Sequence, residues 1–237
     1  MRITYIFMLA FACITLTANG HYLWIELGAP AKLGKQQEVR IFYGEYNEGV
    51  REVRGGRMEE LAGISAWVIT PGGKQIPLPI TTEEKFYKST FTPEENGTYT
   101  VVAVNTVREV VDWSKHGIGV VRPVYYTYKE VIIGQGNKHL TNFPQYAQLK
   151  IQPAKGKNSF TLKFKGQPLA NAKVWFHAPN EWSKELSTNE EGIVSFNPLW
   201  KGQYVVECIY PEKNPGTFNG KDYEAIRHRA TLSIDVQ

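Results

Sequence analysis

Short apolar runs recur along this chain, often alternating with polar residues and separated by turn residues. Such period-two runs are typical of β-strands, and few stretches keep the three- and four-residue apolar spacing of a helix. Pro71-Gly72 and Asn96-Gly97 mark two of the turns. The pattern predicts one brief helical segment at 57–62, and strands at 38–43, 64–70, 86–91, 98–105, 126–133, 160–164, 173–176, 193–196, 203–210 and 230–236.

Turn and polar residues gather at 134–157 and divide the strands into two series. Many short strands with frequent turns favour antiparallel β-sandwiches over an α/β fold. We therefore expect an all-β protein with two antiparallel β-sandwich domains, at 21–145 and 155–237. Because the second series has its own strands and turns, we expect residues 155–237 to fold alone.

Residues 1–20 have the layout of a secretory signal peptide. A basic residue follows the initiating methionine, residues 3–16 are mostly apolar, and the small residues Ala18 and Gly20 precede a cleavage site before His21. The apolar run is short for a membrane anchor. We expect export to the periplasm, with no membrane span after cleavage.

The two cysteines bear on maturation and stability. In an alternative lipoprotein signal Cys13 would become a lipidated N-terminus, but Ala10 and Phe11 do not suit such a signal. Cleavage before His21 leaves Cys208 as the only cysteine, which excludes an intrachain disulfide. Cys208 lies in an apolar run, so we expect a buried, unreactive thiol.

The charge and the motifs exclude several classes of function. The formal charge of +4 falls to +3 when Arg2 is removed with the signal, which is too small an excess to favour nucleic acid or an anionic membrane as partner. The chain contains no phosphate-binding loop, nucleophile elbow or paired-cysteine zinc motif. We therefore expect a protein that is not an enzyme.

His21 is the residue that suggests chemistry. After cleavage its α-amine and the nearer ring nitrogen can chelate one metal ion in a six-membered ring. One more imidazole would complete the tetragonal nitrogen site that suits Cu(II) or Ni(II). His228 and His116 are the candidate imidazoles, His177 and His139 are weaker ones, and Glu45 is a candidate oxygen ligand.

The start of the mature chain also carries a family resemblance. The pattern His-x-x-Trp-x-Glu at 21–26, followed by Phe42-Tyr43-Gly44-Glu45 and closed by residues 228–232, resembles a bacterial periplasmic family of unassigned function. That family includes periplasmic components of nickel and cobalt uptake systems. The resemblance implies a two-domain β architecture and metal binding, with a metal ion and an envelope metal transporter as partners.

The second half carries a resemblance of its own. Gly166, Pro168 and the tight turn at 189–192 make residues 160–210 similar to the prealbumin-like module found as a regulatory domain of carboxypeptidases. Such modules are widely used as spacers, so the resemblance implies an immunoglobulin- or prealbumin-like sandwich and no activity.

Three functions remain open. The first is a metal-binding protein that holds Ni, Co or Cu through His21 and assists metal uptake or handling. The second is a copper-dependent enzyme that oxidises glycans, with Trp24, Trp67 and Trp113 facing the sugar. The third is a metal-free module that binds carbohydrate or protein.

Overall fold

The computed structural model describes residues 20–134 and 147–237, so the predicted signal peptide and His139 lie outside the described residues, Gly20 excepted. The helices of the described residues are three short 3-10 helices: η1 (Tyr46–Glu48), η2 (Arg57–Leu61) and η3 (Ser114–His116). The prediction of an all-β fold is confirmed. None of the described helices is long and apolar enough to cross a membrane.

The first sheet has five strands in the order β1-β2-β7-β6, with β3 beside β2. These strands are β1 (Tyr22–Leu27), β2 (Gln37–Glu45), β3 (Val50–Arg51), β6 (Thr81–Thr82) and β7 (Tyr87–Phe91).

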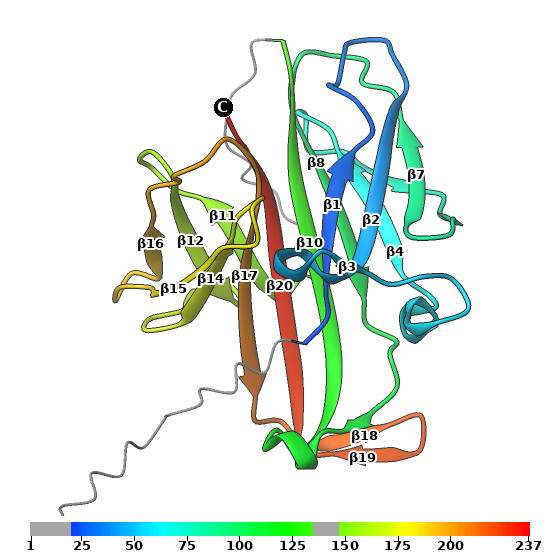
Figure 1. Ribbon diagram of the computed structural model, residues 1–237, viewed down its shortest axis with the longest axis vertical. Helices are drawn as coiled ribbons and strands as arrows, with labels where there is room; N and C mark the ends of the chain where they lie inside the picture. The colour runs from blue at the N-terminus through cyan, green and yellow to red at the C-terminus, as the bar shows by residue number, and fades with distance from the viewer. Residues whose placement is uncertain (1–19, 135–146) are drawn as a thin grey trace, which may run out of the picture.

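The central sheet has nine strands in the order β15-β14-β17-β20-β10-β8-β4-β5, with β9 beside β10. They are β4 (Ser65–Ile69), β5 (Gln75–Leu78), β8 (Gly97–Asn105), β9 (Val111–Asp112), β10 (Val120–Ile133), β14 (Lys173–His177), β15 (Ser183–Ser187), β17 (Gly202–Glu212) and β20 (Ala225–Val236). β10 and β20, long and parallel, run through the middle of the molecule (Figure 1).

The third sheet joins β11 (Leu149–Pro153), β12 (Ser159–Phe164), β13 (Gln167–Pro168) and β16 (Ile193–Ser195). A separate hairpin of β18 (Gly216–Phe218) and β19 (Lys221–Tyr223) lies at one end of β10 (Figure 1).

The two small sheets cover opposite faces of the central sheet. Successive residues of a strand point to opposite faces, and in β10 this places Tyr125 in a core with the first sheet and Tyr126 in a core with the third. Val101 and Val102 divide in the same way in β8. Both faces of the central strands are therefore buried, which explains their nearly continuous apolar sequence.

The central sheet runs across the boundary predicted from sequence. Val121–Lys129 of β10 pair in parallel with Ala225–Ser233 of β20, so the last strand of the chain joins strands of both halves. Within the predicted linker, β11 pairs with β12 and buries Leu149 and Ile151. The independence of residues 155–237 stays a prediction.

Each predicted strand overlaps an observed one, and the helical segment predicted at 57–62 corresponds to η2. The predicted turn at 189–192 is confirmed, with Gly192 at φ +71°. Cys208 is fully buried, as predicted, and burial raises the pKa of its thiol. Among the strands of four or more residues, the pattern missed β1, β5, β11 and β15. β15 is an exposed edge strand, which has little apolar periodicity.

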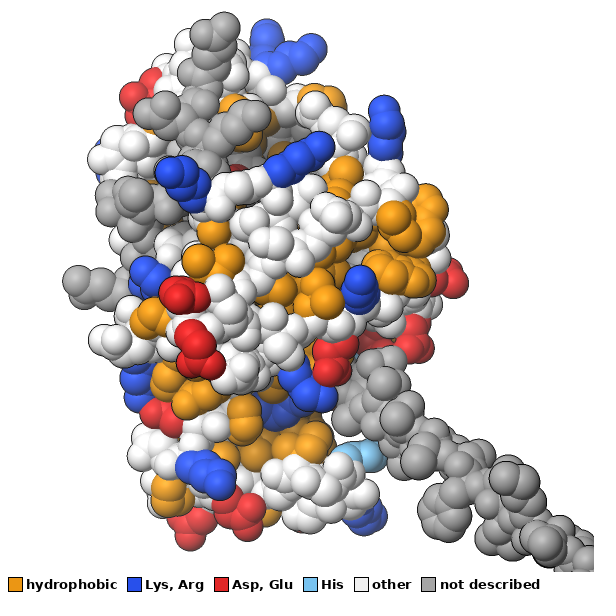
Figure 2. All heavy atoms as spheres, turned by 90° about the vertical axis from the view of Figure 1, so that its left-hand side faces the viewer, with side chains coloured by type: hydrophobic (Ala, Val, Ile, Leu, Met, Phe, Trp, Pro, Cys, Tyr) orange, Lys and Arg blue, Asp and Glu red, His pale blue; other side chains and the backbone are white. Residues whose placement is uncertain are grey.

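Figure 2 views the molecule from the side of β15 and β16, where apolar side chains lie among the charged ones. Leu199 and Trp182 line a hollow together with residues of β15 and β16. Leu199 and Trp200 are exposed, and Trp182 packs edge-on against Trp200 at 5.5 Å between ring centroids. Trp24, in contrast, is fully buried.

Candidate functional site

A cavity of about 260 Å³ opens where the chain enters β1, and we call it the His21 cavity. Tyr43, Trp113 and Tyr125 provide its aromatic wall. Its histidine and charged lining consists of His21, Glu45, Arg57, Arg108, His116, Arg227 and Arg229. The structure thus brings together three of the residues predicted from sequence: His21, Glu45 and His116.

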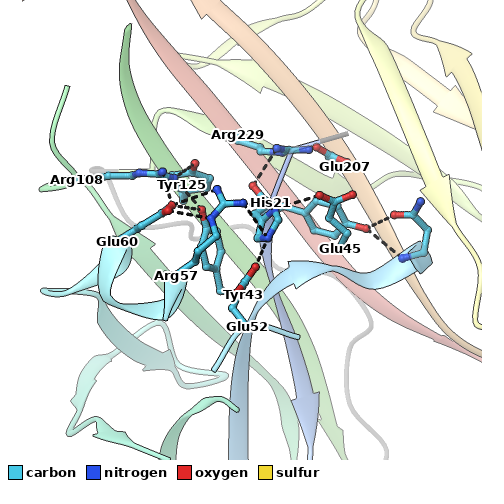
Figure 3. A network of polar contacts seen from close by, with 12 residues as sticks. His21, Tyr43, Glu45, Glu52, Arg57, Glu60, Arg108, Tyr125, Glu207 and Arg229 are labelled. Carbon is cyan, nitrogen blue, oxygen red and sulfur yellow. Dashed lines mark hydrogen bonds and ion pairs between the residues drawn. The ribbon is translucent and has the colours of Figure 1, made fainter. Parts of the chain in front are cut away.

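The ring of His21 lies between two carboxylates (Figure 3). Its Nδ1 is 3.0 Å from Oε1 of Glu45, and its Nε2 contacts Oε1 of Glu52. Arg57 Nη1 lies 3.2 Å from Nε2, and the ring packs at a tilt against Tyr43. All these contacts fix the orientation of the imidazole.

A hairpin explains how the two carboxylates meet one histidine. β2 and β3 pair with Gly44 opposite Arg51, and the intervening turn ends at Gly49 with φ +66°. The chain leaving β3 then follows β2, since the Glu52 amide donates to the Tyr43 carbonyl at 2.8 Å. Glu45 and Glu52 are therefore brought to opposite sides of the His21 ring.

The backbone of His21 is held by a buried ion pair. Arg229 donates to the His21 carbonyl at 2.9 Å and also pairs with Glu207, with both side chains buried. Burial alone would raise the pKa of Glu207, but the charge of Arg229 and the hydrogen bond from His177 outweigh it and hold the pKa at about 2. Glu207 is therefore a carboxylate at neutral pH and keeps Arg229 in place.

His177 extends this network away from the cavity. Its Nε2 lies 2.8 Å from Glu207, its Nδ1 lies 2.7 Å from the Ser183 hydroxyl, and its ring stacks on Tyr22. The order serine, histidine, carboxylate also occurs in hydrolases. Here the carboxylate also holds Arg229, and the network joins β14, β15, β17 and β20 to the start of β1.

A second network covers the other side of the cavity (Figure 3). Glu60 pairs with both Arg57 and Arg108, and Arg108 donates to the Tyr43 hydroxyl at 2.8 Å. Burial alone would raise the pKa of Glu60, but the two arginines hold it below its usual 4.5. Arg108 also lies over the Trp113 ring, 5.6 Å from its centroid.

His228 does not join this site. Unlike its neighbours Arg227 and Arg229, it points to the other face of β20, where Tyr126 and Phe164 pack on its ring. Its Nε2 lies 3.0 Å from Glu212, and burial lowers its pKa despite that carboxylate. Adjacent residues of a strand point to opposite faces, so His228 faces away from the cavity that Arg227 and Arg229 line.

Sequence reasoning missed Glu52 and the four arginines. Gly49, directly after a polar run, signals the turn that brings Glu52 near Glu45. Arg227 and Arg229 alternate around His228, a period-two signal that places both on one face of a strand. No sequence signal indicates that this face meets His21.

In the described parts of the chain, no three His, Cys, Asp or Glu side chains are grouped so that they could hold a metal ion. Glu45 and Glu52 lie on opposite sides of the His21 ring and do not converge on one point. In this structure Gly20 still precedes His21, so the α-nitrogen of His21 is an amide and not an amine.

Comparisons with solved structures show weak similarity. A DUF4785 family protein from Legionella pneumophila subsp. pneumophila str. Philadelphia 1 matches with a TM-score of 0.30 and 9% identity, over 78% of this chain and 51% of that one. This chain therefore spans about half of the Legionella protein. A marsupial T cell receptor matches with a TM-score of 0.25 and 12% identity, over 90% of this chain and 73% of that one.

No curated protein matches this chain. A family model described as a domain of unknown function, DUF4198, matches residues 18–212. That range includes His21, Glu45, Glu52 and the loop of Trp113, although it ends before Arg227. Since the match covers most of the sequence, this chain belongs to the DUF4198 family.

Proposed function

We propose that this is an exported periplasmic protein that binds Ni, Co or Cu through a free N-terminal His21 and assists metal uptake or handling. The observation that carries the proposal is the pair of carboxylates, Glu45 and Glu52, on the two ring nitrogens of His21. The resemblance to periplasmic components of nickel and cobalt uptake systems suggests an envelope metal transporter as partner.

Cleavage before His21 would turn the amide into an amine beside the existing imidazole. The amine and Nδ1 of one residue then form a chelate, in which ordering a single side chain provides two bonds. Arg229 already anchors the His21 carbonyl, and β1 begins at the next residue. The new N-terminus would therefore be held at the cavity.

Glu52 has the position expected of a residue that supports a metal ligand. A histidine that binds a metal through one nitrogen usually donates the other N–H to a carboxylate, which fixes the tautomer. With its proton on Nε2 and donated to Glu52, His21 would leave Nδ1 unprotonated toward Glu45.

Glu45 has the position expected of an oxygen ligand. Two ligand atoms each about 2.1 Å from a metal ion and at right angles to it lie about 3 Å apart. The separation between Glu45 Oε1 and His21 Nδ1 is 3.0 Å. His116 lines the same cavity and is the candidate for a further imidazole.

Maturation is the first test. The intact mass of the secreted protein should correspond to residues 21–237, because the small residues Ala18 and Gly20 suit signal peptidase. A lipidated species that starts at Cys13 would contradict both the cleavage site and the chelate.

The second test measures Ni(II) and Cu(II) binding by calorimetry. The protein beginning at His21 should bind one ion tightly, and His21→Ala or a single extra residue before His21 should reduce affinity at least a hundredfold. His139→Ala, which also removes one imidazole, serves as control and should leave affinity unchanged. Equal binding with and without the extra residue would disprove the proposal.

The contributions of Glu45 and Glu52 to metal affinity can be measured separately. Glu52→Gln should lower metal affinity about 10- to 100-fold, the usual effect of removing a partner of a ligating histidine. Glu45→Gln should lower it at least as much, because it removes a ligand oxygen. Glu48→Gln, which removes the same charge from the nearby turn, should change it less than threefold. Unchanged affinity in both Glu45 and Glu52 variants would contradict this geometry.

The enzymatic alternative can be tested on the same copper-loaded sample. If this were a glycan-oxidising enzyme, ascorbate or peroxide would drive oxidation of polysaccharide. We expect no oxidised products, since Trp24 is buried in the core and Trp113 faces the cavity.

A further inference from the structure

The arginines of the His21 cavity are incompletely paired. Four arginines line it, of which Arg229 pairs with Glu207, while Arg57 and Arg108 share the single carboxylate of Glu60. Arg227 has no carboxylate within ion-pair distance among the described residues. Among the residues that line the cavity, four are arginines and one, Glu45, is a carboxylate.

Arg227 is a cation held partly out of water. Its guanidinium lies over the Trp113 ring, 5.7 Å from the ring centroid. Burial, and then the neighbouring charge of Arg229, lowers its pKa to about 10. Its guanidinium remains charged at neutral pH, and a desolvated cation without a counter-ion is stabilised strongly by an anion that reaches it.

The other charged groups of the cavity leave Arg227 available. Glu45 is the one carboxylate among the lining residues, and its Oε1 is held by the His21 ring. Arg108 and Arg229 are engaged by their own partners. Arg57 shares Glu60 with Arg108. Arg227 is therefore the cavity arginine that no carboxylate of the described residues engages.

We infer that the His21 cavity binds a small organic carboxylate, with the carboxylate on Arg227 and its apolar part against Trp113. A guanidinium matches a carboxylate with two parallel hydrogen bonds. The ligand would lie beside the metal proposed to bind at His21, so the natural cargo would be a metal–carboxylate complex. The metal–carboxylate complex as cargo rests on the proposed function, whereas carboxylate binding by the cavity does not.

The cavity favours a small organic anion over inorganic phosphate or a large ligand. Its volume of about 260 Å³ is below the range of roughly 300–1,000 Å³ that is usual for drug-sized ligands. Tyr125, Ile118 and Trp113 provide apolar surface that a bare phosphate would not use.

The test is calorimetric titration of the metal-free mature protein with succinate, a dicarboxylate that binds metals only weakly. Wild type should bind one succinate, and Arg227→Gln should reduce its affinity at least tenfold. Arg227→Lys keeps the charge but not the planar fork, so it should show intermediate affinity. Arg54→Gln removes an exposed arginine elsewhere and should bind like wild type. Thermal melts of each variant check that the fold is retained.

Further titrations separate this inference from the metal site. Nickel should raise succinate affinity, and Arg227→Gln should leave the affinity for nickel alone within threefold. Arg227-dependent succinate binding without a nickel site would support the carboxylate site and refute the metal function. Equal succinate binding by wild type and Arg227→Gln would overturn the inference. So would no succinate binding by wild type, or phosphate binding as tight as that of succinate.

Discussion

At the scale of single residues, the position of His21 depends on groups distant in sequence. Arg229 binds the His21 carbonyl, and Glu207 holds Arg229. Glu45 and Glu52 then orient the ring. Because Glu207 and Arg229 are both buried, removing one would leave the other as an unpaired buried charge.

We therefore predict that Glu207→Gln destabilises the protein by about 3–5 kcal/mol. Urea unfolding followed by circular dichroism measures this loss. Glu185→Gln removes one partner of an exposed ion pair with Lys173 and should cost at most about 1 kcal/mol. Similar losses of unfolding free energy in the two variants would show that the buried Glu207–Arg229 pair contributes no more to stability than an exposed ion pair.

The same carboxylate predicts sensitivity to acid. The folded-state pKa of Glu207, about 2, lies below its usual 4.5. Its contribution to stability is thus present above pH 4.5 and is lost as the pH falls from there toward 2. Unfolding free energies measured across this range should fall less steeply in Glu207→Gln than in wild type. Parallel curves would contradict the assignment.

At the scale of elements, turns decide which side chains meet. The β2–β3 hairpin places Glu45 and Glu52 around His21, and the turn at 189–192 connects β15 to β16. Both turns contain a glycine at positive φ, Gly49 and Gly192. A positive φ is unfavourable for residues other than glycine. How much a substitution there destabilises the protein also depends on the atoms that surround the new Cβ.

We predict that Gly192→Ala is more destabilising than Gly166→Ala, although both glycines have positive φ. A Cβ at Gly192 would lie 2.7 Å from the Leu162 carbonyl oxygen, whereas at Gly166 it would meet nothing within 4 Å. Gly166→Ala should cost about 1 kcal/mol, the conformational term alone, and Gly192→Ala at least about 2 kcal/mol. Chemical denaturation of both variants tests this, and equal losses would mean that the turn relaxes freely.

At the scale of the whole molecule, the central sheet unites two cores. The third sheet closes the core that also includes Tyr126 and Val102, and β11 contributes Leu149 and Ile151 to it. Both side chains are fully buried. A fragment that starts at residue 155 lacks β11, whereas a fragment that starts at residue 147 retains it.

We predict that residues 147–237 unfold at a higher denaturant concentration than residues 155–237. Losing even one buried leucine or isoleucine side chain costs about 2–5 kcal/mol, and the shorter fragment loses two. Both fragments lack β10, so the stability lost with β10 does not contribute to the difference between their midpoints. Equal midpoints would show that β11 is dispensable and would favour the boundary predicted from sequence.

The sequence by itself determined the fold class and the longest strands, because apolar and alternating runs record which side chains are buried whatever their partners are. The run at 86–91 is an example, since its side chains alternate between buried and partly exposed. Gly192 could be assigned to its turn from local chemistry alone. The pattern also singled out His21 and Glu45, since their chemistry is local. Only the tertiary structure decided that β20 pairs with β10 and that the Arg227 face of β20 meets His21. The paired residues of β10 and β20 are 104 positions apart, and Arg229 and His21 are 208 positions apart. The order of strands in the sheets and the packing of the layers decide which distant residues meet, and neither leaves a periodic signal in the sequence.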